Sequence, residues 1–291
     1  MSLGSTLISL ARALSYRARS LTVAENARAA YLSFKDGLIG SADALYKNQD
    51  PVFAVMDCEM LGPELGFDVR VPVTSFSRST TPLEKLCLGL LLKLQNPATI
   101  FEFGTYRGAT TLLLFKNSST GARLFSFDIP SDIDRAHDVD RGKLINLSDG
   151  GLRDDFSREF FPKSRRVKQV YADLREVDWA YIRELARPDF IFIDADHSYE
   201  GCLRDSRHII GWVGEEAMVV WHDASWKNFY HREANYGVHA SIVDATSPDA
   251  VDYTFRIKDT SLIVRSKQHA ALFKRHLYVG AQPRRPPKCV T

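Results

Sequence analysis

The sequence predicts an α/β fold built on a seven-stranded, mostly parallel sheet with a terminal antiparallel strand. Apolar runs rich in valine, isoleucine and phenylalanine alternate with stretches of helical spacing, which is typical of parallel strands joined by helices. Several of these runs end in glycine, aspartate or histidine, as expected where strand ends meet a ligand at one edge of an open sheet. Near the end of the chain, two alternating runs joined by a short turn predict the antiparallel strand.

The size and charge of the chain limit the classes of function. With 291 residues it can bury a substantial core, which suits one elaborated domain or a domain with an N-terminal addition. The formal net charge is only +2, so charge gives no support to a nucleic-acid partner. No uninterrupted apolar span reaches membrane length, so we expect neither a membrane helix nor a signal peptide.

The four cysteines are scattered along the chain, at Cys58, Cys87, Cys202 and Cys289. None forms a C-x-x-C pair, so neither a zinc knuckle nor a redox motif is indicated. A reduced, cytoplasmic location is therefore the expectation.

The first 80 residues predict a helical extension followed by an irregular connection. Thr22 and Glu25 match a capping box that precedes apolar residues at helical spacing. We expect this extension to pack against the core or against a second copy in a homodimer, with a lid over the substrate as the alternative. Residues 48–80 combine prolines, glycines and mixed charge, which predicts an irregular connection across the mouth of the site.

The main domain is predicted over residues 81–267. It opens with a helix through Leu94, because Thr81 and Glu84 match a capping box with proline at the first helical position. It closes with two alternating strands, residues 251–257 and 261–265, joined by a short hairpin turn. Residues 268–291 predict a C-terminal helix and tail.

The stretch from residue 98 to 111 predicts a buried strand, a tight turn and the start of a helix. Gly104 and Gly108 allow the backbone to turn sharply and to approach a ligand closely, which a side chain would prevent. The first N–H groups of the new helix then face the ligand edge of the sheet. Neither a phosphate-binding P-loop nor the Gly-x-Gly-x-x-Gly dinucleotide fingerprint is present.

The next strand, residues 123–129, carries Asp128 near its end. An acidic residue 20 to 25 positions beyond the glycine turn suits the two hydroxyls of a ribose, with capping of the next turn as the alternative. A third strand from Val167 to Ala172 is followed by Asp173.

Two further apolar strands deliver charged residues to the same edge of the sheet. The strand over 189–194 leads into Asp194, Asp196 and His197, and the strand over 217–221 leads into His222 and Asp223. Bringing charged side chains together in a partly buried place costs free energy, so their presence at this edge favours a catalytic role.

The glycine turn, Glu-Phe-Gly-Thr-Tyr-Arg-Gly, resembles motif I of the class I S-adenosylmethionine-dependent methyltransferases. The later stretches Phe-Ile-Asp-Ala-Asp-His-Ser-Tyr-Glu and Val-Val-Trp-His-Asp resemble the small-molecule branch that includes macrocin- and sugar-type O-methyltransferases. The resemblance spans about residues 82–266. It implies a Rossmann-like sheet, S-adenosylmethionine as cofactor and a small-molecule hydroxyl as acceptor, in a sugar, polyketide or other secondary metabolite.

The resemblance also implies a cofactor site around motif I and the next two strand ends, with Ala172 and Asp173 where the family holds the adenine amino group. The implied cofactor-binding residues are Glu102, Gly104, Thr105, Tyr106, Gly108, Asp128, Ala172 and Asp173.

A hydroxyl acceptor needs a general base or a metal ion that stabilises the oxyanion. By analogy with metal-dependent relatives, Asp194 and Asp223 would bind Mg²⁺ and Asp196 would be a candidate base. The sequence departs from that pattern at His222, where some relatives carry a second carboxylate. His222 or His197 is therefore an alternative base that needs no metal.

Two other functions stay open on the sequence alone. The Asp-x-Asp-His and His-Asp groups could hold a metal for hydrolysis, with the glycine turn purely structural. The chain could also be a non-catalytic S-adenosylmethionine-binding protein on the same fold.

Overall fold

The computed structural model describes residues 50, 52–72, 80–129, 145–146, 162–175, 177–224 and 233–278, with only the backbone described at 145–146 and 233–236. The predicted helical region before residue 50 and the tail after residue 278 lie outside the described residues. So does most of the loop after Asp223. The homodimer contact expected from the N-terminal extension stays a prediction.

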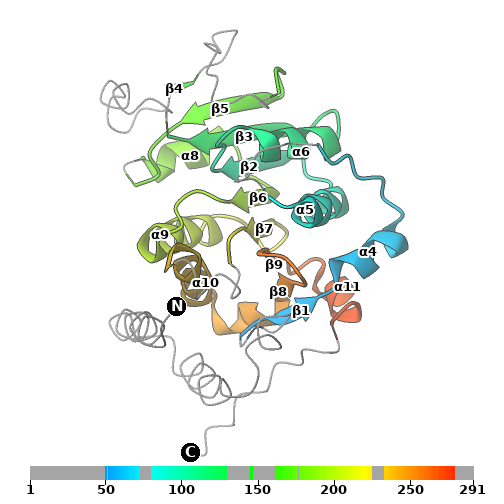
Figure 1. The fold of residues 1–291 in the computed structure, drawn as a ribbon. Helices are drawn as coiled ribbons and strands as arrows, with labels where there is room; N and C mark the ends of the chain where they lie inside the picture. The colour runs from blue at the N-terminus through cyan, green and yellow to red at the C-terminus, as the bar shows by residue number, and fades with distance from the viewer. Residues whose placement is uncertain are drawn as a thin grey trace, which may run out of the picture.

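The described strands form one sheet in the order β1-β8-β9-β7-β6-β2-β3-β5-β4 (Figure 1). All seven predicted strands are present, and β9 is antiparallel to its neighbours β7 and β8, in line with the predicted antiparallel strand. The strand predicted over 251–257 begins only at Thr254, because residues 248–253 form a 3₁₀ helix. The bounds are β1 Ala54–Met56, β2 Thr99–Phe103, β3 Arg123–Asp128, β4 Ile145–Asn146, β5 Val167–Tyr171, β6 Phe190–Ile193, β7 Met218–Trp221, β8 Thr254–Ile257 and β9 Ile263–Arg265.

Two edge strands, β1 and β4, were not predicted. β1 pairs in parallel with β8 over three residues, and β4 pairs antiparallel with β5 over two. Strands this short show no alternation along the sequence, so only their pairing with a neighbour reveals them.

The connection expected to be irregular over residues 48–80 is partly regular. β1 enters the sheet, and helix α4 (Cys58–Leu65) follows it. The side chain of Asp57 caps the start of α4, and Gly66 ends it at a φ of 62°. This segment therefore packs with the sheet.

Helix α5 (Pro82–Gln95) begins as predicted. Thr81 and Glu84 form the complete capping box, with Pro82 at the first helical position. The other helices are α6 (Ala109–Asn117), α8 (Trp179–Leu185), α9 (Tyr199–Ile210), α10 (Glu233–Ala245), the 3₁₀ helix η3 (Pro248–Tyr253) and α11 (Ala270–Arg275). Within the described part of the chain, no helix is long and apolar enough to span a membrane.

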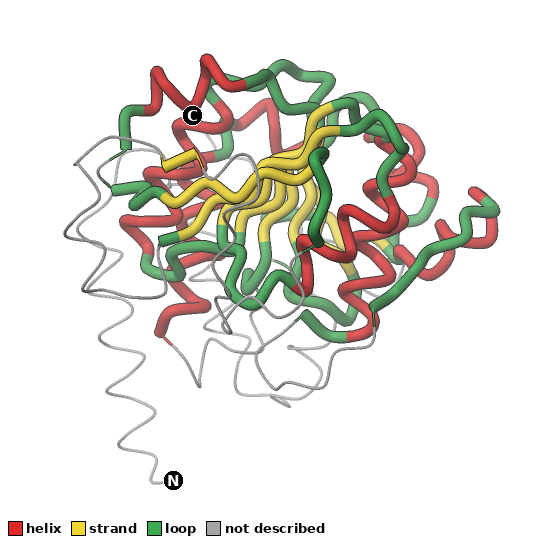
Figure 2. Tube along the Cα trace, turned by 90° about the horizontal axis from the view of Figure 1, so that it is seen from above, coloured by secondary structure: helices red, strands yellow, loops and turns green. Residues whose placement is uncertain are grey.

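The sheet is covered by helices on both faces, which gives three layers (Figure 2). Side chains of α4, α5, α6 and α11 form a core on one face, and those of α8, α9 and α10 form a core on the other. The central strands β2, β6 and β7 are buried throughout, which explains the unbroken apolar sequences of β6 and β7 and the largely apolar sequence of β2, interrupted by Thr99 and Glu102.

The carboxyl ends of the four central parallel strands lie side by side. Backbone bonds continue past the strands: Gly104 N donates to Phe127 O at 2.8 Å, and Asp194 N donates to Phe103 O at 2.7 Å. His222 N donates to Ile193 O at 3.0 Å. The residues after β2, β3, β6 and β7 therefore share one edge of the sheet.

Candidate active site

The turn between β2 and α6 brings the backbone close to its neighbour. Gly104 has a φ of 97°, and a Cβ there would overlap the backbone carbonyl of Asp194. Gly108 is the N-cap of α6 at a φ of 82°. Both glycines predicted from the sequence are thus required by local geometry.

Tyr106 and Asp128 are joined across this turn. Tyr106 adopts a φ of 46°, unusual for a residue with a side chain, and its backbone N–H donates to Asp128 Oδ2 at 2.8 Å. The backbone N–H of Ile129 donates to the other carboxylate oxygen at 2.9 Å. The Asp128 carboxylate is therefore fixed beside the turn, where the ribose-binding hypothesis requires it.

Glu102 is completely buried beneath the turn. Thr111 Oγ1 and Ser126 Oγ both donate to its Oε2 at 2.6 Å, while Oε1 has no hydrogen-bond partner within the described part of the chain. Burial raises the pKa of Glu102 to about 8, even though these two hydrogen bonds lower it. Glu102 therefore holds a proton more readily than an exposed glutamate.

The hydroxyl of Thr105 belongs to a buried network. It lies 2.6 Å from Ser126 Oγ and accepts a hydrogen bond from Gln169 Nε2 at 3.1 Å. Ser126 and Gln169 come from the two neighbouring strands, β3 and β5, and neither was singled out in the sequence. Each lies within a strand among apolar residues, so the sequence indicates only that these two polar side chains are buried.

Ala172 and Asp173 lie at the end of β5, next to the end of β3. Ala172 N donates to Asp128 O at 2.9 Å, which places the two strand ends together. The guanidinium of Arg175 binds the Asp173 carboxylate, with the shortest contact at 2.6 Å. These bonds lower the pKa of Asp173. An adenine amino group at Asp173 would share its carboxylate with this arginine.

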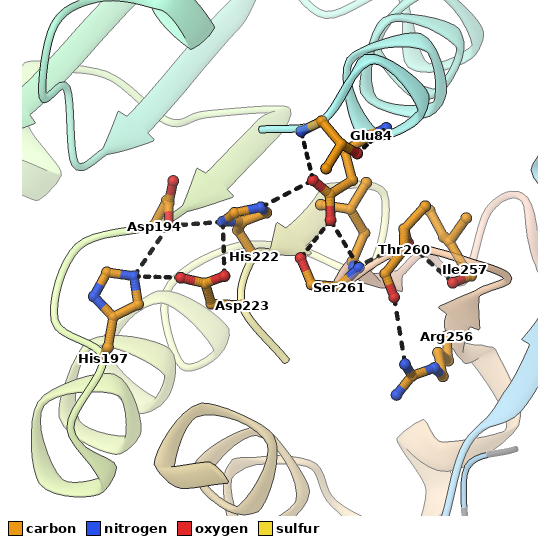
Figure 3. A network of polar contacts seen from close by, with 11 residues as sticks. Glu84, Asp194, His197, His222, Asp223, Arg256, Ile257, Thr260 and Ser261 are labelled. Atoms are coloured by element: carbon orange, nitrogen blue, oxygen red, sulfur yellow. Dashed lines mark hydrogen bonds and ion pairs between the residues drawn. The ribbon is translucent and has the colours of Figure 1, made fainter. Parts of the chain in front are cut away.

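Asp194, His197 and Asp223 form a tight cluster at the ends of β6 and β7 (Figure 3). His197 Nε2 lies 2.9 Å from Asp223 Oδ2 and 3.3 Å from Asp194 Oδ1. Its side chain is 37% exposed, the most of the three. Asp223 has a φ of 57°, a strained conformation for a residue with a side chain.

His222 lies behind this cluster and is nearly buried. Its Nδ1 is 3.0 Å from Asp194 Oδ1 and 3.5 Å from Asp223 Oδ1. On the other side of the ring, Nε2 lies 3.4 Å from Glu84 Oε2, an ion-pair contact whose angle does not make a hydrogen bond. Glu84 was predicted only as a helix-capping residue, because sequence spacing gives no sign that α5 reaches the end of β7.

The charges in this cluster stabilise one another. Burial would raise the pKa of Asp194, but the neighbouring His222 and His197 lower it to about 2. Hydrogen bonds with Asp194 and Asp223 raise the pKa of His197 to about 10. The pKa of His222 is raised as well, because its carboxylate neighbours outweigh its burial.

Asp196 lies apart from this cluster. Its Oδ1 accepts a hydrogen bond from Ser198 N at 2.9 Å, and its carboxylate stands against Gly201 in the first turn of α9. The structure therefore separates the second aspartate of the Asp-x-Asp stretch from the first. Its role as a base stays a prediction.

The donor atoms of the cluster do not fit Mg²⁺ well. The three residues with donor atoms within 4.8 Å of one another offer two carboxylate oxygens and one imidazole nitrogen. Mg²⁺ prefers an octahedron of oxygen ligands, whereas imidazole suits transition metals. The structure thus brings Asp194 and Asp223 together as expected, but with histidines where further oxygen ligands would be needed.

Comparison with known proteins agrees with this arrangement. Residues 101–224 match the family described as methyltransferase domain. This segment is similar to methyltransferase domains. The matched segment begins in β2 and ends just after Asp223, so it contains the glycine turn, Asp128 and the charged cluster. This match confirms the resemblance to methyltransferases inferred from the sequence.

Solved structures similar to the chain include O-methyltransferases. The O-methyltransferase from Bacillus cereus, in complex with SAH, is 16% identical with a TM-score of 0.44, covering 81% of this chain and 96% of that one. The SAH-bound methyltransferase PaMTH1 from Podospora anserina is 14% identical with a TM-score of 0.46, covering 81% and 96%.

A third similar structure is the O-methyltransferase TomG from Streptomyces achromogenes, in complex with SAM. It is 16% identical with a TM-score of 0.38, covering 81% of this chain and 94% of that one. No curated protein sequence matches the chain.

Proposed function

We propose that this protein transfers a methyl group from S-adenosylmethionine to a hydroxyl of a small molecule, such as a sugar, a polyketide or another secondary metabolite. The observation that carries the proposal is the contact between Gly104 and the backbone of Asp194. It places a glycine turn suited to a nucleoside directly beside a cluster of acidic and imidazole groups. A methyl donor and an acceptor would therefore meet at the edge of the sheet where these strands end.

The cofactor side of the proposal rests on geometry that fits a nucleoside. Gly104 and Gly108 leave the backbone bare, and the Asp128 carboxylate is held next to them by backbone N–H groups. In the proposal, the ribose hydroxyls donate to Asp128, and Ala172 and Asp173 contact the adenine. When bound, S-adenosylmethionine supplies an electrophilic methyl group on a sulfonium.

The acceptor side rests on the groups after β6 and β7. The O–H bond of the acceptor must break as the new O–CH₃ bond forms, so its proton has to pass to a side chain. His222 and His197 already face carboxylates, which makes them proton donors to Asp194 and Asp223. Asp196, which lies outside that pairing, is our first candidate for the base.

Calorimetric titration with S-adenosylhomocysteine, first with Mg²⁺ and then with chelator, tests the cofactor. We expect micromolar binding in both conditions. A radiolabelled-methyl screen of hydroxylated small molecules then tests the acceptor class. Absence of S-adenosylhomocysteine binding would contradict the proposal and favour a hydrolytic use of the same groups.

A further inference from the structure

We infer that His222, held in place by Glu84, takes the position of a divalent cation between Asp194 and Asp223, so that this site works without a bound metal ion. The inference rests on the proposed function, since it concerns how the same acceptor site is charged. The observation behind it is the set of three carboxylates that surround one nearly buried imidazole (Figure 3).

Both nitrogens of the His222 ring face carboxylate oxygens. Nδ1 lies 3.0 Å from Asp194, and Nε2 lies 3.4 Å from Glu84. A neutral imidazole has one N–H and one acceptor nitrogen, and the acceptor nitrogen would be repelled by a carboxylate. Only the doubly protonated ring satisfies both neighbours, so His222 contributes a positive charge at this point.

Glu84, which faces the ring, is itself held in place by several hydrogen bonds. Its Oε2 accepts a hydrogen bond from Thr81 N at 2.7 Å, and its Oε1 accepts from Ser261 N at 2.8 Å and Ser261 Oγ at 2.5 Å. The carbonyl of Ser261 in turn accepts a hydrogen bond from Ala224 N at 2.9 Å. Glu84 therefore links α5 to His222, just before Asp223, and through Ser261 of the β8–β9 hairpin to Ala224, just after it.

This arrangement already neutralises the charge that would attract a metal ion. His222 contacts Asp194 and Asp223 from behind, and His197 bridges the same two carboxylates from the more exposed side. A metal ion bound by both aspartates would lie within a few ångströms of the His222 cation. Like charges at that distance repel strongly in a partly buried site.

The role of His222 can be reversed by replacing it with a carboxylate. His222→Asp removes the cation and adds an oxygen ligand beside Asp194 and Asp223, which is the donor set that hard divalent cations prefer. A matched control is His269→Asp. It adds the same charge at a histidine that bonds to Gln95, at the C-terminal end of α5 and so away from the cluster.

The experiment measures binding of Mn²⁺ alone, by the loss of the free-ion EPR signal, to the full-length wild type and to both variants. We expect no saturable binding to the wild type or to His269→Asp up to roughly 1 mM, the weak end for protein cation sites. We expect His222→Asp to bind at least about tenfold more tightly, with the gain lost when Asp194→Asn is added.

Saturable Mn²⁺ binding to the wild type that Asp194→Asn abolishes would overturn the inference, and this arm remains decisive if His222→Asp does not fold. Failure of a folded His222→Asp protein to bind Mn²⁺ would also overturn it. S-adenosylhomocysteine titration of the same wild-type sample separates the two ideas, because loss of that binding refutes the proposed function whatever Mn²⁺ does.

Discussion

Gly104 and Asp194 are in direct backbone contact, so the turn after β2 and the first residue after β6 are packed without room for a side chain at position 104. This contact couples the glycine turn to the charged cluster of Asp194, His197 and Asp223. Anything that separates the two strand ends would also move the Asp194 carboxylate relative to the glycine turn.

Gly104→Ala should therefore destabilise the protein by about 2 kcal/mol or more, because the new Cβ overlaps the Asp194 carbonyl at a positive φ. Urea unfolding measures the free energy change. Gly121→Ala is the control, since a Cβ there meets nothing within 4 Å and the free energy of unfolding should stay within about 0.5 kcal/mol of the wild type. Equal stability of the two variants would contradict the contact.

Glu84→Gln should destabilise the protein more than Thr81→Ala does. Thr81→Ala weakens the capping box of α5, which is worth about 1 kcal/mol, whereas glutamine at position 84 can still form it. Glu84→Gln instead removes the carboxylate charge that faces Nε2 of the His222 cation, at a cost of about 1 to 3 kcal/mol. Chemical denaturation of both variants checks the difference. A loss no larger than that of Thr81→Ala would mean that the charge of Glu84 contributes little beside His222.

Glu102 should make stability depend on pH. Its pKa is about 8 in the folded protein against an ordinary value of 4.5, so folding favours the protonated form. This contribution is fully present below pH 4.5 and is lost as the pH rises toward 8. Between these limits, the wild type should lose about 1.4 kcal/mol of unfolding free energy per pH unit relative to Glu102→Gln. Parallel stability curves from pH 5 to 7.5 would show that Glu102 titrates normally.

Asp128→Asn should weaken S-adenosylhomocysteine binding by about 1 to 3 kcal/mol, the usual cost of losing charge-assisted hydrogen bonds to a ligand. The control is Asp178→Asn, which changes an aspartate that caps α8 through the backbone of Ala180. Isothermal calorimetry should show wild-type affinity for this control. An unchanged dissociation constant for Asp128→Asn would remove Asp128 from the cofactor site.

Asp50→Asn should destabilise the protein by about 3 kcal/mol. Asp50 is buried, and its Oδ2 pairs with His239 Nε2 of α10 at 2.8 Å. Removing one partner leaves a buried group without compensation. Asp57→Asn provides the comparison, because its ion pair with Lys258 is partly exposed and should cost at most about 1 kcal/mol. Thermal unfolding distinguishes the two, and a loss of similar size in both would contradict a structural role for the Asp50 pair.

Local patterns were enough to predict much of this protein. The seven main strands, the α5 capping box, the glycine turn and the residues after each strand follow from hydrophobic periodicity and turn chemistry, which act over a few neighbouring residues. Parallel strands end at a common edge, so the sequence also predicted that Asp128, Asp194 and Asp223 would lie at one edge of the sheet.

Only the tertiary structure decided which of these groups touch. It joined Glu84 to His222 across 138 positions of sequence, bonded Gln169 to Thr105, and paired Asp50 with His239. It also turned Asp196 toward α9 and away from its neighbour Asp194. Such contacts depend on how helices and strands pack in space. Their energy comes from burial and from electrostatic interactions between elements that are far apart in the sequence, so no local spacing of residues predicts them.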